Sequence, residues 1–198
     1  MKLTLPYSPI PEHITLIGIH GKAGSGKDTI ANVLSNTWFS QVKAFADPVR
    51  DLTAAMFRID RVLFIDRTDK ETIIPDLGYS PRELLQYVGT ELVRDNVDEQ
   101  FWIKHMSWRI AASHSSTIII PDVRFQNEVN WVLSHPKSYL ISVHRPGISE
   151  VGIKNHASEA GIKIPEEYAH KAYDIQNTGT LEDLYKKVQD FTDRTFAI

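Results

Sequence analysis

The stretch ITLIGIHGKAGSGKDTIANVL, residues 14–34, decides the fold of this 198-residue chain. It begins with a short apolar run rich in β-branched residues, which is typical of a buried parallel strand. The glycine-rich turn GKAGSGKDT follows at 21–29. Ile30, Val33 and Leu34 then recur at the spacing of a helix. Strand, glycine-rich loop and helix, in that order, predict a phosphate-binding P-loop.

The residues of this loop have the chemistry that phosphate binding requires. The glycines allow successive backbone N–H groups to point into one concavity, and the start of the helix adds the positive end of a dipole. Lys27 is placed to reach the β- and γ-phosphates of a nucleotide. A glycine-rich turn that binds no ligand is the competing interpretation, which the flanking strand and helix disfavour.

One position of the loop departs from the general motif. The usual pattern has Ser or Thr directly after the lysine as a magnesium ligand, whereas this chain has Asp28 there and Thr29 next. A carboxylate is a good ligand for a hard cation, so Asp28 would hold Mg²⁺ directly or through water. The alternative is that Thr29 takes this role with a shifted backbone.

The composition fits a globular domain with its own core, because 42% of the residues are hydrophobic and 24% are charged. A net charge of −3 argues against general nucleic-acid binding, and the absence of cysteine excludes disulfides and thiolate metal sites. No apolar run approaches the ~18 residues of a membrane span. The proline-rich start does not fit a signal peptide. We therefore expect a cytoplasmic protein with neither nucleic-acid nor membrane partners.

A second short strand is predicted over 42–46, with Lys43 and Asp47 at its ends. Pro48 suits the first position of a following helix, and Asp47 suits its N-cap. Arg50 would then lie near the start of that helix, and the pattern leaves open whether it is a solvated surface charge or part of a site.

The stretch SPRELLQYVGTELVRD at 80–95 predicts a strong helix with its own N-terminal cap. One face of this helix would carry Arg82, Gln86, Gly89 and Thr90, which together suit a polar ligand. A mid-helix glycine costs about 1 kcal/mol relative to alanine, and close approach of a ligand or a neighbouring backbone would explain it. The competing interpretation is a solvated face with a helix–helix contact at Gly89.

The clearest buried strand, 117–120, runs directly into PDVR at 121–124. Ligands of open α/β sheets bind at the carboxyl ends of strands, so Asp122 and Arg124 are placed for chemistry. Asp122 would bind magnesium or accept a proton, and Arg124 would bind phosphate through two hydrogen bonds. Glu128 lies one helical turn beyond Arg124. An ion cluster of these side chains that only holds the loop is the competing interpretation.

A further strand, predicted at 139–143, ends at HRPG and brings Arg145 to the same sheet edge. Residues 146–166 are polar and punctuated by glycine, which suits a mobile lid. Asn177 belongs to a turn that precedes the last helix.

These pieces together resemble the deoxynucleoside monophosphate kinases best known from bacteriophages. The resemblance covers nearly the whole chain, and an Asp directly after the P-loop lysine is a feature of that family. The matching segments are GKAGSGKDT at 21–29, AFADPVR at 44–50, SPRELLQYVGTELVR at 80–94, FWI at 101–103, PDVRFQNE at 121–128, HRPG at 144–147, HASE at 156–159 and NTGTLEDL at 177–184.

The resemblance implies an α/β protein with the P-loop NTPase fold, in which a parallel sheet of about five strands is flanked by helices. It implies a single kinase domain over residues 1–198, with a helical region for the monophosphate at about 57–112 and a lid at about 146–166. The implied reaction transfers the γ-phosphoryl group of ATP to a deoxynucleoside monophosphate, giving the diphosphate and ADP for DNA synthesis. If the protein is viral, the reaction would take place in the host cytoplasm.

The resemblance also implies roles for individual residues. Lys27, Arg124 and Arg145 would be catalytic, the last as a lid arginine. Asp28, with Asp122 as a second candidate, would hold Mg²⁺. ATP would be bound by Gly21, Lys22, Ala23, Gly24, Ser25, Gly26, Lys27, Asp28, Thr29 and, near the adenine, Asn177. The monophosphate would be bound by Lys43, Asp47, Arg82, Gln86, Gly89, Thr90, Trp102, Asp122, Arg124 and Glu128.

Two other functions remain as alternatives at this point. The first is a kinase of another small phosphorylated metabolite, similar to phosphomevalonate kinase, whose P-loop also has Asp after Lys. Trp102 and the face with Gln86 and Thr90 favour a nucleobase instead. The second is a P-loop module that holds ATP without transferring phosphate, and the arginines at two further strand ends argue against it. ATP and a small phosphorylated acceptor are thus the expected partners, with a homodimer left open.

Overall fold

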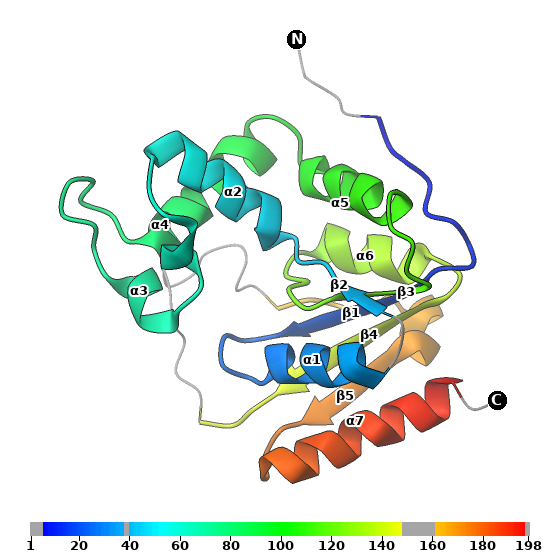
Figure 1. Ribbon diagram of the computed structural model, residues 1–198. Coiled ribbons are helices and arrows are strands. Elements are labelled where there is room, and N and C mark those ends of the chain that lie inside the picture. The colour runs from blue at the N-terminus through cyan, green and yellow to red at the C-terminus, as the bar shows by residue number, and fades with distance from the viewer. Residues whose placement is uncertain (1–5, 38–39, 148–160, 197–198) are drawn as a thin grey trace. The chain divides into compact units, whose positions relative to one another are not determined.

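The computed structural model describes residues 6–37, 40–147 and 161–196. In this described part, five parallel strands form one sheet in the order β2-β3-β1-β4-β5 (Figure 1). This confirms the predicted class, a parallel sheet flanked by helices. The strands are β1 Thr15–Gly21, β2 Ser40–Val42, β3 Thr117–Ile120, β4 Ser138–His144 and β5 Ala172–Gln176.

The helices connect the strands in the βα order that a parallel sheet requires. The α-helices are α1 Lys27–Thr37, α2 Ala46–Phe57, α3 Arg67–Glu71, α4 Pro81–Gln86, α5 Phe101–Ala111, α6 Gln126–Ser134 and α7 Leu181–Phe196. The 3₁₀ helices are η1 Arg61–Phe64 and η4 Glu166–Lys171, and η2 Tyr87–Asp95 is a π-helix. Among the residues described, no helix combines the length and the apolar content that crossing a membrane would take.

The chain divides into two compact units. The helical unit contains the described residues up to Ser8 together with Phe45–Trp108, and the sheet unit contains Pro9–Ala44 and the described residues from Arg109 onward. The helical region predicted at 57–112 falls mostly in the helical unit. Most of the predicted lid, including HASE at 156–159, lies outside the described residues.

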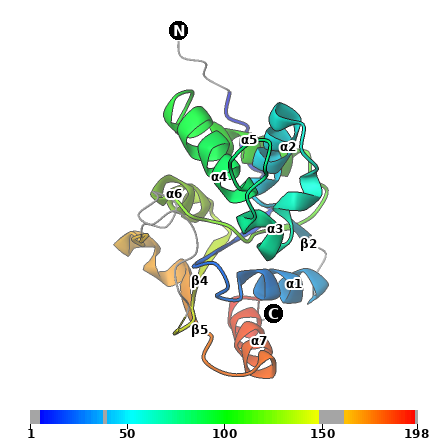
Figure 2. The ribbon, with the colours of Figure 1, turned by 90° about the vertical axis from the view of Figure 1, so that its left-hand side faces the viewer.

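The core of the sheet unit follows from the alternation of side chains along β1. Ile17 and Ile19 point to one face, where they join buried side chains of α1 and α7. Gly18 points to the opposite face, where a Cβ atom would lie 3.2 Å from Val132 of α6. The helices therefore cover both faces of the sheet (Figures 1 and 2).

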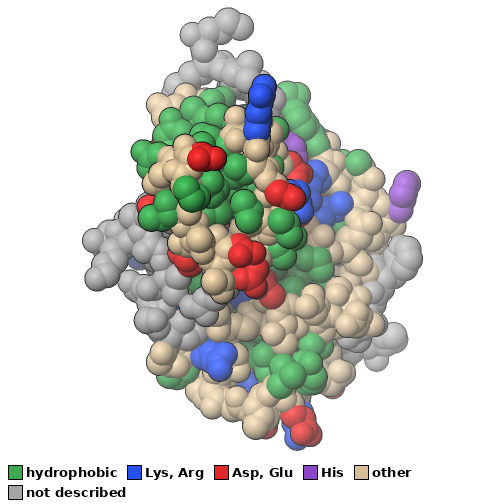
Figure 3. All heavy atoms as spheres, turned by 60° about the vertical axis from the view of Figure 1, so that its left-hand side comes forward, with side chains coloured by type: hydrophobic (Ala, Val, Ile, Leu, Met, Phe, Trp, Pro, Cys, Tyr) green, Lys and Arg blue, Asp and Glu red, His purple; other side chains and the backbone are tan. Residues whose placement is uncertain are grey.

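The helical unit buries its apolar side chains less completely than the sheet unit. Phe64 and Val88 are fully buried, yet hydrophobic side chains gather on the surface that Figure 3 shows. The large exposed hydrophobic residues of this unit between α2 and η2 are Leu52, Met56, Val62, Ile65, Ile73, Tyr79 and Tyr87.

The boundaries predicted around residue 45 are wrong. Strand β2 ends at Val42, and α2 begins at Ala46 after Phe45, whose side chain makes no capping hydrogen bond. Asp47 is therefore inside the first turn and is not the N-cap. Its carboxylate instead accepts a hydrogen bond from Nη1 of Arg50 at 3.0 Å, and acidic side chains in a first turn also suit the helix dipole.

The helix predicted over 80–95 begins as expected but changes its winding. Ser80 and Glu83 form the predicted capping box. From Tyr87 onward the backbone is a π-helix, a rare geometry that is common at functional sites. The carbonyl of Gly89 accepts a hydrogen bond from Nε1 of Trp102 at 2.7 Å, and an outside donor to a helix carbonyl is a physical cause of such a departure.

Candidate active site

The loop between β1 and α1 has the backbone that its glycines predict. Gly24 and Gly26 have φ angles of 77° and 105°, which residues that carry a Cβ atom rarely adopt. The loop is closed by a hydrogen bond from the Ser25 N–H to the Lys22 carbonyl at 3.1 Å. The Lys22 carbonyl also accepts from Nζ of Lys27 at 2.7 Å. The lysine is thus held at the loop, where a nucleotide phosphate would compete for its ammonium group.

Asn177 joins this loop to the ends of two other strands. Its side-chain Nδ2 donates to the Ser25 carbonyl at 2.8 Å, and its backbone N–H donates to the His144 carbonyl at 2.7 Å. A Cβ atom on Gly26 would lie only 2.7 Å from this Nδ2. Asn177 therefore holds the shape of the P-loop, while its predicted position near adenine stays a prediction.

A cavity of about 710 Å³ opens beside the P-loop, entirely within the sheet unit. Lys27, Arg124 and Arg145, the three cations predicted to be catalytic, all line it. They come from the start of α1 and from the segments that follow β3 and β4. The volume is in the range of nucleotide-sized sites, and cations from three elements can neutralise a polyphosphate without a positive net charge on the chain.

The loop that carries Arg124 is fixed by Glu128. Oε2 of Glu128 accepts hydrogen bonds from the N–H groups of Arg124 and Phe125 at 2.7 and 3.1 Å. Burial raises the pKa of this carboxyl to about 7, and Asp122 adds to the rise, while the two backbone bonds and Arg124 oppose it. Glu128 is 5% exposed. Its observed contacts are therefore with backbone, and its predicted contact with the monophosphate stays a prediction.

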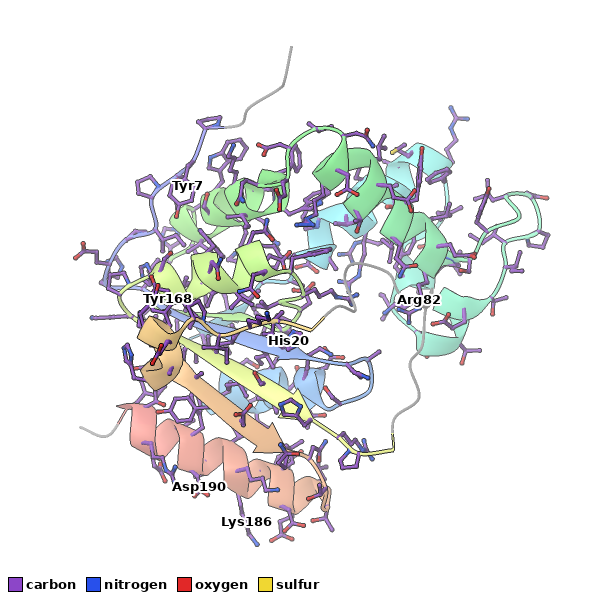
Figure 4. The ribbon with its side chains drawn as sticks, turned by 180° about the vertical axis from the view of Figure 1, so that it is seen from behind. Tyr7, His20, Arg82, Tyr168, Lys186 and Asp190 are labelled. Carbon is purple, nitrogen blue, oxygen red and sulfur yellow. The ribbon has the colours of Figure 1, made fainter. Side chains whose placement is uncertain are left out.

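Sequence reasoning missed several residues that line the cavity. His20, labelled in Figure 4, is next to the first loop glycine, and its Nδ1 lies 2.9 Å from the Val123 carbonyl. His144, Asp174 and Gln176 line the cavity from the ends of β4 and β5. The sequence signal that could have identified them is their position at the carboxyl ends of strands, where ligands of such sheets bind.

The remaining residues predicted to bind the monophosphate are divided between the units. Lys43 belongs to the sheet unit, where its N–H donates to the Ile119 carbonyl at 2.9 Å. Asp122 also belongs to that unit, in the segment after β3. The others lie in the helical unit: Asp47, Arg82, Gln86, Gly89, Thr90 and Trp102.

Within the helical unit these side chains differ in their contacts. Nε of Arg82, labelled in Figure 4, is 2.5 Å from Oε1 of Glu71. Trp102 is 8% exposed, and its indole N–H donates a hydrogen bond to the Gly89 carbonyl. A Cβ atom on Gly89 would lie 3.1 Å from Cγ1 of Val49, so this glycine allows a helix–helix contact. Gln86 and Thr90 are buried polar residues.

Comparison with known proteins identifies a consistent set of relatives. A family model described as deoxynucleotide monophosphate kinase matches residues 67–188. A protein of Acanthamoeba polyphaga mimivirus, provisionally named deoxynucleotide monophosphate kinase, is 32% identical over 195 residues, which cover 88% of this chain and 94% of the relative. Deoxynucleoside-5′-monophosphate kinase of Escherichia phage T5 is 28% identical, with 82% and 92% covered.

A solved structure supports the fold independently. The crystal structure of TT1252 from Thermus thermophilus matches with a TM-score of 0.51 and 18% identity, over 92% of this chain and 98% of that one. At this identity the likeness concerns the fold alone.

Proposed function

Because the chain belongs to the deoxynucleotide monophosphate kinase family, we propose that it transfers the γ-phosphoryl group of ATP to the 5′-phosphate of a deoxynucleoside monophosphate. It is a phosphotransferase that takes small molecules as substrates and ATP as co-substrate. The viral and phage relatives support a role in nucleotide supply for DNA synthesis within an infected host.

The observation that carries this proposal is the cavity beside the P-loop, with Lys27, Arg124 and Arg145 in its lining. Phosphoryl transfer depends on positioning and on neutralising the charge of the transferring group, with little covalent chemistry for the protein to perform. Three cations from three separate elements supply that charge. A module that only stores ATP needs no such convergence.

The roles of the residues follow from their contacts. Lys27 would leave the Lys22 carbonyl for the β- and γ-phosphates, and Arg124 and Arg145 would bind the transferring group. Asn177 and Glu128 would act as positioning residues, because each holds the backbone of a loop that lines the cavity. A general base is not required, since the acceptor phosphate is already anionic near neutral pH.

The residues present fit a magnesium ion held mainly by the nucleotide. Asp28 is an exposed carboxylate in the first turn of α1, and the described residues contain no cluster of three metal-binding side chains. Mg²⁺ sites in kinases commonly use one or two carboxylates, water and substrate phosphates. Asp28 would hold the ion, with Asp122 as a second ligand, and the bound ion would neutralise phosphate charge.

Asp28→Ala should raise the Mg²⁺ concentration needed for half-maximal turnover; an unchanged requirement would transfer the role to Thr29 or Asp122.

Each unit has candidates for binding the monophosphate: the residues of the helical unit named above, and Lys43, Asp122, Arg124 and Glu128 of the sheet unit. Gln86 and Thr90 support this part of the proposal, because they are 8% and 7% exposed and polar. Buried polar side chains require hydrogen-bond partners, and the base of a nucleotide can provide one for Oε1 of Gln86, which has none among the described residues.

The function is tested by incubating the full chain with labelled ATP and each deoxynucleoside monophosphate, with phosphomevalonate as a further acceptor. We expect a diphosphate product from at least one deoxynucleotide and none from phosphomevalonate. Lys27→Met should lower turnover by about 10³-fold. Lys186→Met is the matched control, because Lys186 is 70% exposed on α7. Binding of ATP without transfer to any acceptor would establish the non-catalytic module instead.

A further inference from the structure

Several buried polar atoms of the helical unit have no hydrogen-bond partner among the described residues, and two of them lie on helices that pack against each other. These two are Nε of Arg50, a donor, and Oε1 of Gln86, an acceptor. An unsatisfied buried polar group costs about 1–3 kcal/mol, and native structures satisfy nearly all of them. A ligand that offers one acceptor and one donor would remove both costs.

The two residues come from helices that pack against each other. Helix α2 packs against α4 and η2, and Val49 and Gly89 mark the close approach, since a Cβ atom on Gly89 would lie 3.1 Å from Cγ1 of Val49. Arg50 directly follows Val49. Gln86 precedes Gly89 by about one helical turn. Arg50 and Gln86 therefore lie on the two sides of the packing between α2 and the α4–η2 segment.

The guanidinium of Arg50 is fixed before any ligand arrives. Nη1 donates to Oδ1 of Asp47 at 3.0 Å, and the two side chains are only 25% and 29% exposed. This bond uses Nη1 and leaves the buried Nε without an acceptor among the described residues. Asp47 is thus a positioning residue for Arg50, which gives a physical role to a residue predicted from sequence to bind the substrate.

Two other polar side chains near the crossing of these helices have hydrogen-bond partners. The indole N–H of Trp102 and the carbonyl of Gly89 bond to each other at 2.7 Å, and the hydroxyl of the buried Thr53 donates to the Val49 carbonyl at 2.7 Å. On the two helices α2 and α4, Arg50 therefore still needs an acceptor and Gln86 still needs a donor.

The chemistry of the occupant follows from this pair. A phosphate dianion offers acceptors only and would leave Oε1 of Gln86 unsatisfied. Every nucleobase presents an acceptor and an N–H donor on one edge, and Arg and Gln are side chains that pair with such edges. We propose that Arg50, together with Gln86, hydrogen-bonds the base of the acceptor deoxynucleotide and contributes to base selection. This inference rests on the proposed function.

The test compares Arg50→Met with Arg61→Met, which makes the same chemical change at an exposed arginine paired with Asp51. Turnover and KM are measured for dAMP, dGMP, dCMP and dTMP, and KM for ATP in parallel. Loss of a charged hydrogen bond should lower kcat/KM by about 10-fold or more. The loss should differ between bases, with KM for ATP unchanged within about 2-fold. The control should match the wild type.

An equal loss for all four monophosphates would mean that Arg50 binds phosphate or sugar, and no loss would mean that water satisfies Nε; either result overturns the proposal. If Arg50→Met does not fold, the near-isosteric Gln86→Met carries the same expectation. In the double variant the two losses should be less than additive, because both side chains meet one base. If the wild type transfers phosphate to no deoxynucleotide, the proposed function fails, and calorimetric binding of the four monophosphates to the same variants decides the inference.

Discussion

Each unit contains a helix whose third residue is a glutamate that accepts a hydrogen bond from the backbone N–H of the residue before the helix. In α4 of the helical unit, the Ser80 N–H donates to Oε2 of Glu83 at 2.8 Å. In α6 of the sheet unit, the Phe125 N–H donates to Oε2 of Glu128 at 3.1 Å. The bonds from Ser80 lower the pKa of Glu83, whereas burial raises the pKa of Glu128 to about 7.

The difference between these glutamates comes from their surroundings and not from the local motif. Glu83 keeps part of its surface exposed, and its bonds to Ser80 favour the charged carboxylate. Glu128 is 5% exposed, so loss of hydration outweighs its two backbone bonds. One glutamate therefore stabilises a helix end, while the other holds the Arg124 loop at a cost in stability near neutral pH.

We expect the largest effect on turnover from a change at Arg124, the cavity residue whose loop Glu128 holds. Arg124→Ala should lower kcat by about 10²–10³-fold, because in the proposed function its guanidinium donates hydrogen bonds to the transferring phosphate. The melting temperature should stay near that of the wild type, since the backbone bonds to Glu128 remain. Arg194→Ala, at an exposed position of α7, is the control. Wild-type turnover with unchanged melting would remove Arg124 from the site.

A pH series tests the opposite signs of the two pKa shifts. Because the folded-state pKa of Glu128 is raised from 4.5 to about 7, its stabilising contribution is complete below about pH 4.5. That contribution is lost as the pH rises through 7. We measure the free energy of unfolding of Glu128→Gln and of the wild type with urea. The value for Glu128→Gln minus the value for the wild type should rise by up to about 3 kcal/mol between pH 4.5 and 8.

Glu83→Gln provides the matched comparison in the helical unit. The lowered pKa of Glu83 means that its contribution is present above pH 4.5 and is lost as the pH falls through the folded-state pKa. The wild type should therefore become more stable than Glu83→Gln, in free energy of unfolding, as the pH rises. If both variants shift in the same direction with pH, burial does not separate the two sites.

A third prediction concerns the other side chain that holds a loop backbone in the sheet unit. Asn177→Ala removes the bond from Nδ2 to the Ser25 carbonyl and should raise KM for ATP by about 10-fold. KM for the monophosphate should not change. Asn130→Ala, at an exposed position of α6, is the control. A change in the monophosphate KM alone would show that Asn177 does not act through the P-loop.

Much of this arrangement could be predicted from local patterns. The P-loop order of strand, loop and helix, the capping box at Ser80 and the placement of Arg124 after β3 each depend on residues close together in the sequence. The contact of Asn177 with Ser25 spans 152 residues, and no periodicity records such a pairing.

Two other features also escaped sequence reasoning. The spacing placed Glu128 one turn from Arg124. It could not show that Glu128 bonds to backbone N–H groups, because the same spacing also allows a contact with the Arg124 side chain. The π-helix at 87–95 includes Gly89, whose carbonyl accepts a hydrogen bond from Trp102, and the two residues are 13 positions apart in the sequence.

The smallest effect is expected at the cap of the helical unit. Ser80→Ala removes the hydroxyl that donates to Oε2 of Glu83 at 2.9 Å and accepts from the Glu83 N–H at 3.3 Å. Loss of an N-cap side chain costs about 1 kcal/mol of stability. Because one of the bonds that lower the pKa of Glu83 is also lost, this deficit should shrink as the pH falls below 4.5. Urea denaturation at pH 7 and pH 3.5 measures both values, and a deficit that is equal at the two pH values would separate the cap from the charge of Glu83.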